Sequence, residues 1–179
     1  MADTLPSLIS LKKDFDVTIR PAVRADLPKL EHEGNFTKFR NLFRRAFREQ
    51  QNGRRLMLVA DSNNYPVGRL FILYTSSDHS IADGKRRAYL YSFFVMTPFR
   101  GYGIGSAMVA HAERVLRDHG FRYVTIAVAK HNAGALRLYE RLGYKKMRDD
   151  AGRWSYTDHK GRQHNINEPC WILEKALPL

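Results

Sequence analysis

A glycine-rich turn between a predicted strand and a predicted helix constrains this chain more than any other feature of its sequence. The aromatic run at 88–96 predicts a strand, and the apolar spacing at 103–118 predicts a helix. Between them, Gly101, Gly103 and Gly105 alternate with larger residues. Since glycine has no Cβ, backbone N–H groups in such a turn approach a ligand closely. The helix N-terminus adds unpaired donors and partial positive charge, so the segment predicts a site for a pyrophosphate.

Two other phosphate-binding turns do not fit this segment. A P-loop requires Gly-Lys followed by Ser or Thr, and the sequence holds no such tripeptide. The dinucleotide fingerprint G-x-G-x-x-G needs a last glycine where this chain has Ser106, counted from Gly101, or Met108, counted from Gly103. A nucleoside-triphosphate or dinucleotide site is therefore disfavoured.

Size and composition favour one folded domain. The chain has 179 residues, and at roughly 150 residues per domain we expect an N-terminal extension at 1–15 and one domain over 16–176. The single cysteine, Cys170, excludes an intrachain disulfide framework and a cysteine-based zinc cluster, and its apolar setting predicts a packed core thiol. No apolar run approaches the roughly 18–20 residues of a membrane-spanning helix, and no signal-peptide pattern opens the chain. We therefore expect a cytoplasmic protein.

The charge balance indicates an affinity for anions. Lys and Arg number 30 against 18 Asp and Glu, which gives a formal net charge of +12 at pH 7. A nucleic acid, a phosphorylated cofactor and simple solubility each explain such an excess. The basic residues are dispersed in pairs and triplets, which is typical of solvated faces. The charge alone does not choose among these partners.

A basic, amphipathic helix is predicted from Asn35, which we expect to be its N-cap, to Gly53, which would end it. Its Arg and Lys residues fall mostly on the side opposite to an aromatic stripe, so we expect a core-facing helix with a solvated basic back. A helix that binds phosphate or a partner is the alternative. The stripe consists of Phe36, Phe39, Phe43, Ala46 and Phe47.

The order of the remaining elements predicts a mixed sheet. Connections between the early strands are too short for crossover helices, which favours an antiparallel meander. After the glycine turn, strands alternate with helices. In the helix at 103–118, Ile104, Ala107, Met108, His111 and Val115 would share the inner face, with His111 as a satisfied core residue. The predicted strands lie at 16–21, 56–60, 66–74, 88–96, 121–129, 144–147 and 170–174, with a further helix at 132–142 and a small hairpin arm at 154–158.

At this point the sequence resembles the GNAT superfamily of N-acetyltransferases. The segment from Arg100 to Gly105, Arg-Gly-Tyr-Gly-Ile-Gly, satisfies that family's acetyl-CoA signature, Gln/Arg-x-x-Gly-x-Gly/Ala. The segment from Asn132 to Tyr144 is similar to its second signature, Asn-x-x-Ala-x-x-x-Tyr-x-x-x-Gly-Phe/Tyr. The resemblance spans roughly residues 17–175. It implies a mixed α/β fold with a central, mostly antiparallel sheet of about seven strands, flanked by about four helices and splayed beyond Val95.

The resemblance also implies roles for individual residues. Acetyl-CoA would be the co-substrate, without a metal. Backbone amides of the glycine turn would hold its pyrophosphate, while the Val95 amide would face the thioester carbonyl. Asn132 would bind the pantetheine or thioester end, and Tyr139 would protonate the leaving thiolate, as the one catalytic residue assigned. The implied cofactor-binding set is Val95, Met96, Thr97, Arg100, Gly101, Tyr102, Gly103, Ile104, Gly105, Ser106, Asn132 and Tyr139.

The general base is not identified by the sequence. Many family members carry a Glu on the strand before the glycine turn, and residues 88–94 hold no carboxylate. Tyr89 or Tyr91 would line a water chain or simply pack, and Asp78 and His79 lie in a polar loop. No acceptor is readable either: an acidic wall for a cationic amine has only Glu31, Glu33, Asp149 and Asp158 as candidates.

Other reactive residues carry weaker indications. Asp158, His159 and His164 lie in a polar segment without a recognisable ligand frame, so we expect no metal site there. The expected function is N-acetyl transfer from acetyl-CoA to a primary amine, either a small molecule or a peptide. A non-catalytic acyl-CoA sensor and a basic nucleic-acid-associated domain are the alternatives. We expect no membrane partner and no nucleic acid, and a homodimer is compatible with the resemblance.

Overall fold

The computed structural model describes residues 16–178, and the predicted extension at 1–15 lies outside the described residues. A single seven-stranded sheet forms the centre, in the order β1-β2-β3-β4-β5-β9-β6. All its neighbours are antiparallel except β4 and β5, so the predicted mixed α/β fold is confirmed. The strands are β1 Thr18–Pro21, β2 Arg55–Ser62, β3 Tyr65–Leu73, β4 Arg87–Val95, β5 Tyr123–Ala129, β6 Lys145–Asp150 and β9 Cys170–Ala176.

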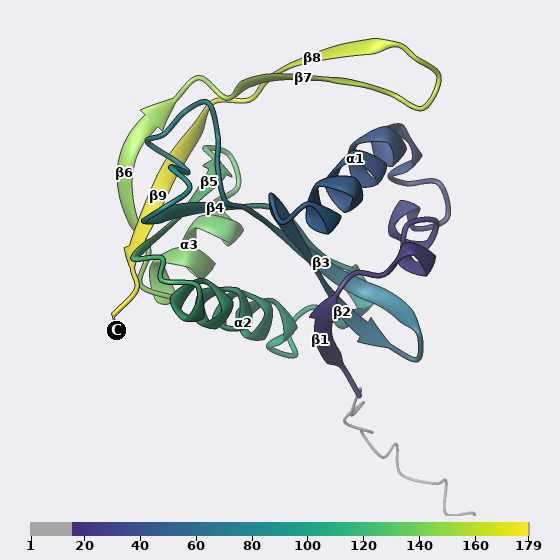
Figure 1. The fold of residues 1–179 in the computed structure, drawn as a ribbon, viewed down its shortest axis with the longest axis horizontal. Coiled ribbons are helices and arrows are strands. Elements are labelled where there is room, and N and C mark those ends of the chain that lie inside the picture. Colours follow the sequence, from purple (N-terminus) through teal and green to yellow (C-terminus); the bar gives the residue numbers. More distant parts are fainter. Residues whose placement is uncertain (1–15, 179) are drawn as a thin grey trace, which may run out of the picture.

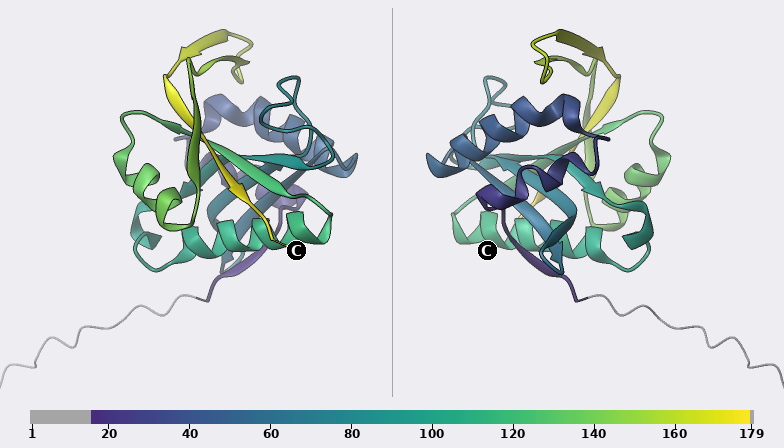
Figure 2. Two further views of the ribbon diagram at one scale, coloured as in Figure 1. Left: turned by 90° about the vertical axis from the view of Figure 1, so that its left-hand side faces the viewer. Right: turned by 90° about the vertical axis from the view of Figure 1, so that its right-hand side faces the viewer.

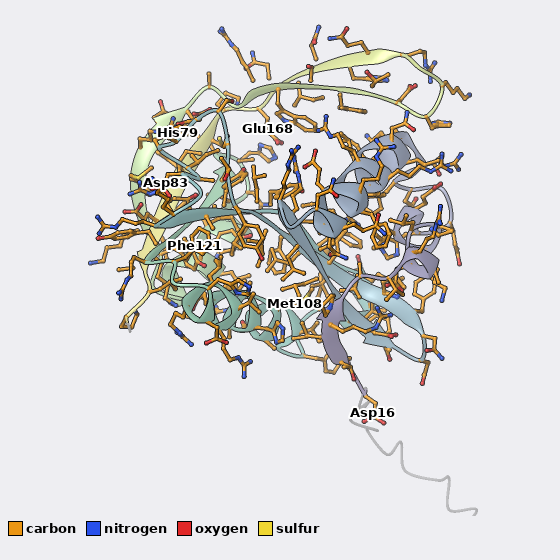
Figure 3. The ribbon with its side chains drawn as sticks, in the orientation of Figure 1. Asp16, His79, Asp83, Met108, Phe121 and Glu168 are labelled. Atoms are coloured by element: carbon orange, nitrogen blue, oxygen red, sulfur yellow. The ribbon has the colours of Figure 1, made fainter. Side chains whose placement is uncertain are left out.

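Helices cover both faces of this sheet. α1 (Arg40–Gln51) lies on one face, while α2 (Ile104–Asp118) and α3 (Ala133–Arg141) lie on the other, as Figure 1 and the side views of Figure 2 show. Met108 and Phe121, labelled in Figure 3, belong to the buried layer between α2 and the sheet. Single 3-10 turns occupy Arg24–Asp26, Lys29–Glu31, Thr37–Phe39 and Thr97–Phe99. No helix among residues 16–178 is long and apolar enough to cross a bilayer.

A hairpin arm is present, but it is longer than predicted, because residues 154–158 cover little more than its first strand. β7 (Arg153–Thr157) pairs with β8 (Gln163–Asn167) in a separate two-stranded sheet. Figure 1 shows the arm reaching from the β6–β9 side of the molecule across to α1. It is held there by the ring of Tyr156, 4.9 Å from that of Phe39, and by a hydrogen bond from Asn41 Nδ2 to Asp158 O at 2.7 Å.

The predicted start of the first long helix is wrong. α1 begins at Arg40, and Asn35 is not its N-cap. His32, Glu33 and Gly34 all have positive φ, which holds the chain out of a helix, and a 3-10 turn follows before α1. The aromatic stripe is nevertheless correct, because Phe36 and Phe39 join the same apolar cluster from outside the helix.

The predicted inner face of α2 is also partly wrong. Ala107 is exposed and His111 is only half-buried, so His111 is not a core residue. The buried face includes Met108, Val109, Ala112 and Leu116, together with Glu113. The Glu113 carboxylate accepts hydrogen bonds from Tyr144 Oη at 3.0 Å and Lys175 Nζ at 2.7 Å. From its charge alone, Glu113 would be expected to face solvent. These two partners satisfy its carboxylate inside the protein, which allows it to be buried.

Candidate active site

The functional geometry starts from a bulge in β4. Arg69 pairs with Phe94 and Phe71 with Tyr91, so β4 carries one residue more than β3 over this stretch. Ser92 takes a positive φ of 54° within it. Such an extra residue bends a strand and increases its twist.

Beyond the bulge, β4 separates from β5. The last residue of β4 that pairs with β5 is Leu90, opposite Ile126, whereas β5 stays paired with β9 as far as Ala129. The two parallel strands therefore splay apart, and the separation begins before Val95, earlier in β4 than we expected. We call the space between the diverging ends of β4 and β5 the wedge.

The peptide group of Val95 points into this wedge. Val95 lies opposite Gly68 of β3. The next pair along, Met96 and Val67, is joined by a hydrogen bond from Met96 N to Val67 O at 2.9 Å. Hydrogen-bonded and non-hydrogen-bonded pairs alternate along an antiparallel ladder, so Val95 and Gly68 form a non-hydrogen-bonded pair. The N–H and C=O groups of such a pair point away from the partner strand. The Val95 N–H is therefore directed away from β3, to the side that β5 has left.

The glycine turn lies at the end of β4 and opens α2. Gly101 and Gly103 have φ of 84° and 82°, which side-chain-bearing residues rarely adopt, and a Cβ at either would meet no atom within 4 Å. The first helical bond is Ala107 N to Gly103 O at 2.9 Å, so the amides of Ile104, Gly105 and Ser106 have no earlier turn to bond to. With no acidic residue in the first turn of α2, an open, electropositive cradle results.

Side chains of the turn connect it to β4. Arg100 donates from Nε to Val95 O at 2.8 Å, and its guanidinium lies 5.9 Å from the centre of the Phe94 ring. The Thr97 carbonyl accepts from Arg100 N at 3.2 Å, which closes the 3-10 turn. Tyr102 is 53% exposed at the tip. The turn is thus fixed to the strand end whose peptide faces the wedge.

The second predicted motif forms α3. Asn132 caps this helix, accepting from Ala135 N at 3.0 Å through Oδ1, and its own side chain is exposed. Tyr139 is only 4% exposed, and its ring centre lies 6.2 Å from that of Phe93 and 5.8 Å from that of Tyr144. Burial, and secondarily the charge of Tyr89, raise the pKa of the Tyr139 phenol, so it stays protonated at neutral pH.

Phe93 brings the two predicted motifs together. Its ring packs near that of Tyr139, and Gly105 of the turn approaches the same ring closely. Tyr139 and the α2 N-terminus therefore lie on the same face of β4. Asn132 and Arg100 are both exposed, Asn132 capping α3 and Arg100 bonded to the end of β4.

The tyrosines of β4 do not supply an evident base. Tyr89 and Tyr91 stack with ring centres 6.0 Å apart, on the face that carries α1. The Tyr91 hydroxyl accepts from Arg55 Nη1 at 2.6 Å. Burial raises the pKa of both phenols, so neither ionises readily.

Most of the carboxylates considered for an acidic wall are paired with cations of the protein itself. Glu31 accepts from Arg40 Nε at 2.6 Å, Asp149 lies 2.5 Å from Lys130 Nζ, and Asp158 accepts from Arg162 Nε at 3.0 Å. Glu33 is exposed. The loop with His79 and Asp83 lies on the β6 side in Figure 3, where Asp78 pairs with Arg148 at 2.7 Å.

The polar arm shows no convergent metal-ligand set. Asp158 is 1% exposed and accepts from His164 Nε2 at 2.8 Å, and these bonds hold its pKa below the usual range. No group of three potential ligands gathers within residues 16–178. Cys170 is buried in β9, as expected, and burial raises the pKa of its thiol.

Sequence reasoning missed a buried cation beside the bulge. Arg69 of β3 is 5% exposed, and its Nε lies 3.2 Å from Ser92 Oγ. Burial lowers the pKa of Arg69 to about 10, and that of neighbouring His32 to about 4, with the Arg69 charge as the second cause. An arginine inside the apolar stretch Val67 to Leu73 was the available signal, since buried arginines are rare unless paired.

Comparisons with known proteins identify the family and agree with this fold. The sequence profile of the acetyltransferase (GNAT) family matches residues 19–144. An uncharacterised N-acetyltransferase of Methanocaldococcus jannaschii is 33% identical over 88 residues, which are 49% of this chain and 38% of that protein. The N-alpha-acetyltransferase MAK3 of Arabidopsis thaliana is 40% identical over 58 residues, 32% of this chain and 30% of the relative. The matches thus span less than half of each relative.

Solved structures share the whole fold at low identity. The ribosomal-protein-S18-alanine N-acetyltransferase of Escherichia coli superposes with a TM-score of 0.65 at 19% identity, covering 91% of this chain and 95% of that one. The Salmonella typhimurium protein yncA, solved with its cofactor acetyl-CoA, gives 0.67 at 17% identity, covering 92% and 95%.

Proposed function

Since this chain belongs to the GNAT acetyltransferase family, we propose that it transfers the acetyl group of acetyl-CoA to a primary amine by direct attack within a ternary complex. The observation that carries this proposal is the wedge between β4 and β5. Its β4 edge ends in a peptide group directed into the opening, and both the amide cradle of α2 and the phenol of Tyr139 contact the same strand through Phe93.

The glycine turn fits the pyrophosphate of the co-substrate. Open space in front of Gly101 and Gly103, the positive end of α2 and the amides up to Ser106 suit a dianionic group. Arg100, already anchored to Val95 O, adds a fixed positive charge. These residues would hold acetyl-CoA, which supplies an activated acetyl thioester.

Val95 and Asn132 would align the extended arm of the co-substrate. The end of β4 that has left β5 offers an edge along which an extended arm could lie like an added strand, and Val95 N–H would donate to the carbonyl oxygen as negative charge develops there. Asn132 uses Oδ1 to cap α3, which leaves its Nδ2 group as the donor for the arm.

Tyr139 would act as the general acid. A thiol has a pKa of about 8.5, and a phenol about 10 before burial, so proton transfer from Tyr139 to a departing thiolate needs good positioning. The burial that raises the pKa of Tyr139 keeps the proton available across the neutral range. Contact with Phe93 and Tyr144 restricts its ring.

Deprotonation of the amine is left to solvent in this proposal. Residues 88–94 of β4 carry no carboxylate, and Tyr91 already accepts a hydrogen bond from Arg55. A lysine-like amine has a pKa of about 10.4, so only a small fraction is neutral at pH 7. Turnover should therefore rise with pH through the neutral range.

An acceptor panel tests the proposal directly. Acetyl-CoA is incubated with amino acids, peptide N-termini, polyamines and aminoglycosides, and release of free thiol is recorded. We expect saturable release with at least one class. Binding of coenzyme A, seen as a thermal shift, without thiol release from any amine would favour the acyl-CoA sensor and contradict the enzyme assignment.

A further inference from the structure

The environment of Arg69 departs from what a structural arginine needs. Its Nη1 atom has no hydrogen-bond partner within residues 16–178, and no carboxylate there lies within ion-pair distance. Buried charges in proteins are normally paired, because an unpaired one loses its hydration without compensation. Even the more exposed Arg20, Arg40, Arg55 and Arg87 of this protein are each paired with an Asp or Glu.

Aromatic rings partly replace the missing anion. The guanidinium carbon lies 4.2 Å from the centre of the Phe36 ring, 4.8 Å from that of Phe94 and 5.2 Å from that of Phe43. Cation–π contacts stabilise such a charge, but a ring provides no acceptor for an N–H group. The Arg69 guanidinium therefore still has an N–H donor, on Nη1, that is available to an acceptor.

The position of Arg69 relates this cation to the wedge. Arg69 pairs in register with Phe94, the residue directly before Val95, and its Nε lies within hydrogen-bond distance of Ser92 Oγ in the bulge. Arg69 and Phe94 both lie against Phe36, which packs in the apolar cluster beneath α1. Phe93, Tyr139 and the N-terminus of α2 pack in the cluster on the other face. If the co-substrate is held from the α2 face, the α1 face is left for the acceptor.

The aromatic cage of Phe36, Phe43 and Phe94 around the guanidinium is partly exposed. Phe36 and Phe94, and Ser92 beside them, are each only partly buried, so the surroundings of Arg69 reach the protein surface there. Phe36 belongs to the segment that leaves the helical region at His32, Glu33 and Gly34. His32, also next to Phe94 with ring centres 5.2 Å apart, has both ring nitrogens unpartnered among the described residues. Unpartnered nitrogen atoms of Arg69 and His32 therefore lie close together beside Phe94.

We propose that Arg69 is the recognition site for a carboxylate on the amine acceptor, so that the acceptor is an amine that also carries an acid group. A guanidinium matches a carboxylate in two parallel hydrogen bonds, and the apolar cage would strengthen them. The general charge pattern agrees, because most of the acidic side chains expected to attract a cationic amine are paired internally. This inference rests on the proposed acetyl transfer and specifies its acceptor.

Matched pairs of acceptors test the inference in the wild-type protein. Each pair is a free amino acid and its primary amide, which keeps the amine and loses the negative charge. With kcat/KM expressed per concentration of neutral amine, we expect the free acids to be favoured by about 10- to 100-fold, the size of one charge-assisted hydrogen-bonding contact. An equal or higher kcat/KM for the amides on that basis, or a preference for peptides without acidic groups, would overturn the inference.

Variants locate the preference. Arg69→Gln should raise KM for the free acids while leaving KM for the amides and for acetyl-CoA unchanged, and Arg69→Lys should give an intermediate ratio. Because an amide also lowers the pKa of its neighbouring amine, the ratio is compared between variants. Arg55→Gln is the control: it removes a half-buried arginine of β2 that contacts Tyr91, and it should keep the preference.

Two results separate the inference from its premises. If Arg69→Gln weakens the binding of acetyl-CoA and leaves the binding of the acceptor unchanged, the anion that Arg69 binds belongs to the co-substrate and the inference is wrong. If no amine releases thiol, thermal shifts with the same amino acids in the presence of coenzyme A decide. Stabilisation by the free acids that Arg69→Gln abolishes would support the carboxylate site although the enzyme assignment fails, and its absence would refute both.

Discussion

A Cβ atom placed on Gly105 would lie 3.0 Å from Cζ of Phe93, so the first turn of α2 fits β4 only because it lacks a side chain there. This glycine differs from Gly101 and Gly103, which meet open space and are needed for their positive φ. The close approach brings the amides of α2 to the strand that also contacts Tyr139. Glycine is thus required at these three positions of one motif for two different physical reasons, positive φ at Gly101 and Gly103 and close packing at Gly105.

Gly105→Ala should lower the free energy of unfolding by about 1–3 kcal/mol, since the added methyl group overpacks against Phe93. The measurement is urea unfolding. Gly134→Ala, in the first turn of α3, is the control, because its Cβ would be 3.8 Å from Asn132 Oδ1 and helix propensity should then stabilise by up to about 1 kcal/mol. If both substitutions stabilise, the packing argument is incorrect.

Gly103→Glu should abolish the thermal shift caused by coenzyme A, because it places negative charge in the phosphate cradle. Wild-type protein with ligand at 100 times its Kd should gain about 2.7 kcal/mol. Gly120→Glu is a matched control at the other end of α2: Gly120 has a similar φ of 83° and equally open surroundings. Loss of the shift in both variants would point to general damage instead of a local site.

Tyr139→Phe should preserve coenzyme A binding and slow turnover by about 10²-fold, the lower range for general acid catalysis. Because burial raises the pKa of the phenol, the wild-type rate should show no decline on the alkaline side up to about pH 10. Tyr144→Phe removes a comparable buried hydroxyl, bonded to Glu113, and should cost stability of about 1 kcal/mol without slowing the reaction. If Tyr139→Phe turns over as fast as the wild-type protein, Tyr139 is not the general acid.

His32 should make stability depend on pH between about 6.5 and 4. Its folded pKa is lowered to about 4, by burial first and by Arg69 second, so the folded state holds the neutral ring. Stability is therefore full above the unfolded pKa of about 6.5 and falls as the unfolded chain binds the proton. His32→Asn, which tolerates the positive φ at this position, should flatten this part of the curve in denaturant titrations at successive pH values. An unchanged slope would contradict the assignment.

Local patterns predicted most elements because their causes are local. Alternation and aromatic content identified β2, β3 and β4, and glycines marked the ends of α1, α2 and α3. The turn between β2 and β3 has an equally local cause, because asparagine tolerates the positive φ found at Asn63 and Asn64. Tyr139 and the glycine turn were recognisable because their spacing repeats a known motif.

The bulge at Ser92 and the pairing of polar side chains were not readable. Nothing in the residues of β4 specifies where an extra residue is inserted, because the register with β3 is decided by the packing of both faces. In the same way, Glu113 is buried because Tyr144, just before β6, and Lys175 of β9 reach it from distant parts of the chain.

The sequence by itself determined the order of strands and helices, the amide-rich turn and the family, since these follow from short-range spacing. Only the tertiary structure decided that β4 leaves β5 after Leu90, that Val95 turns its peptide into the opening, and that Arg69 is buried beside it without a carboxylate partner among the described residues. Those features depend on which segments meet across the sheet, and a meeting of distant segments is a property of the packed chain.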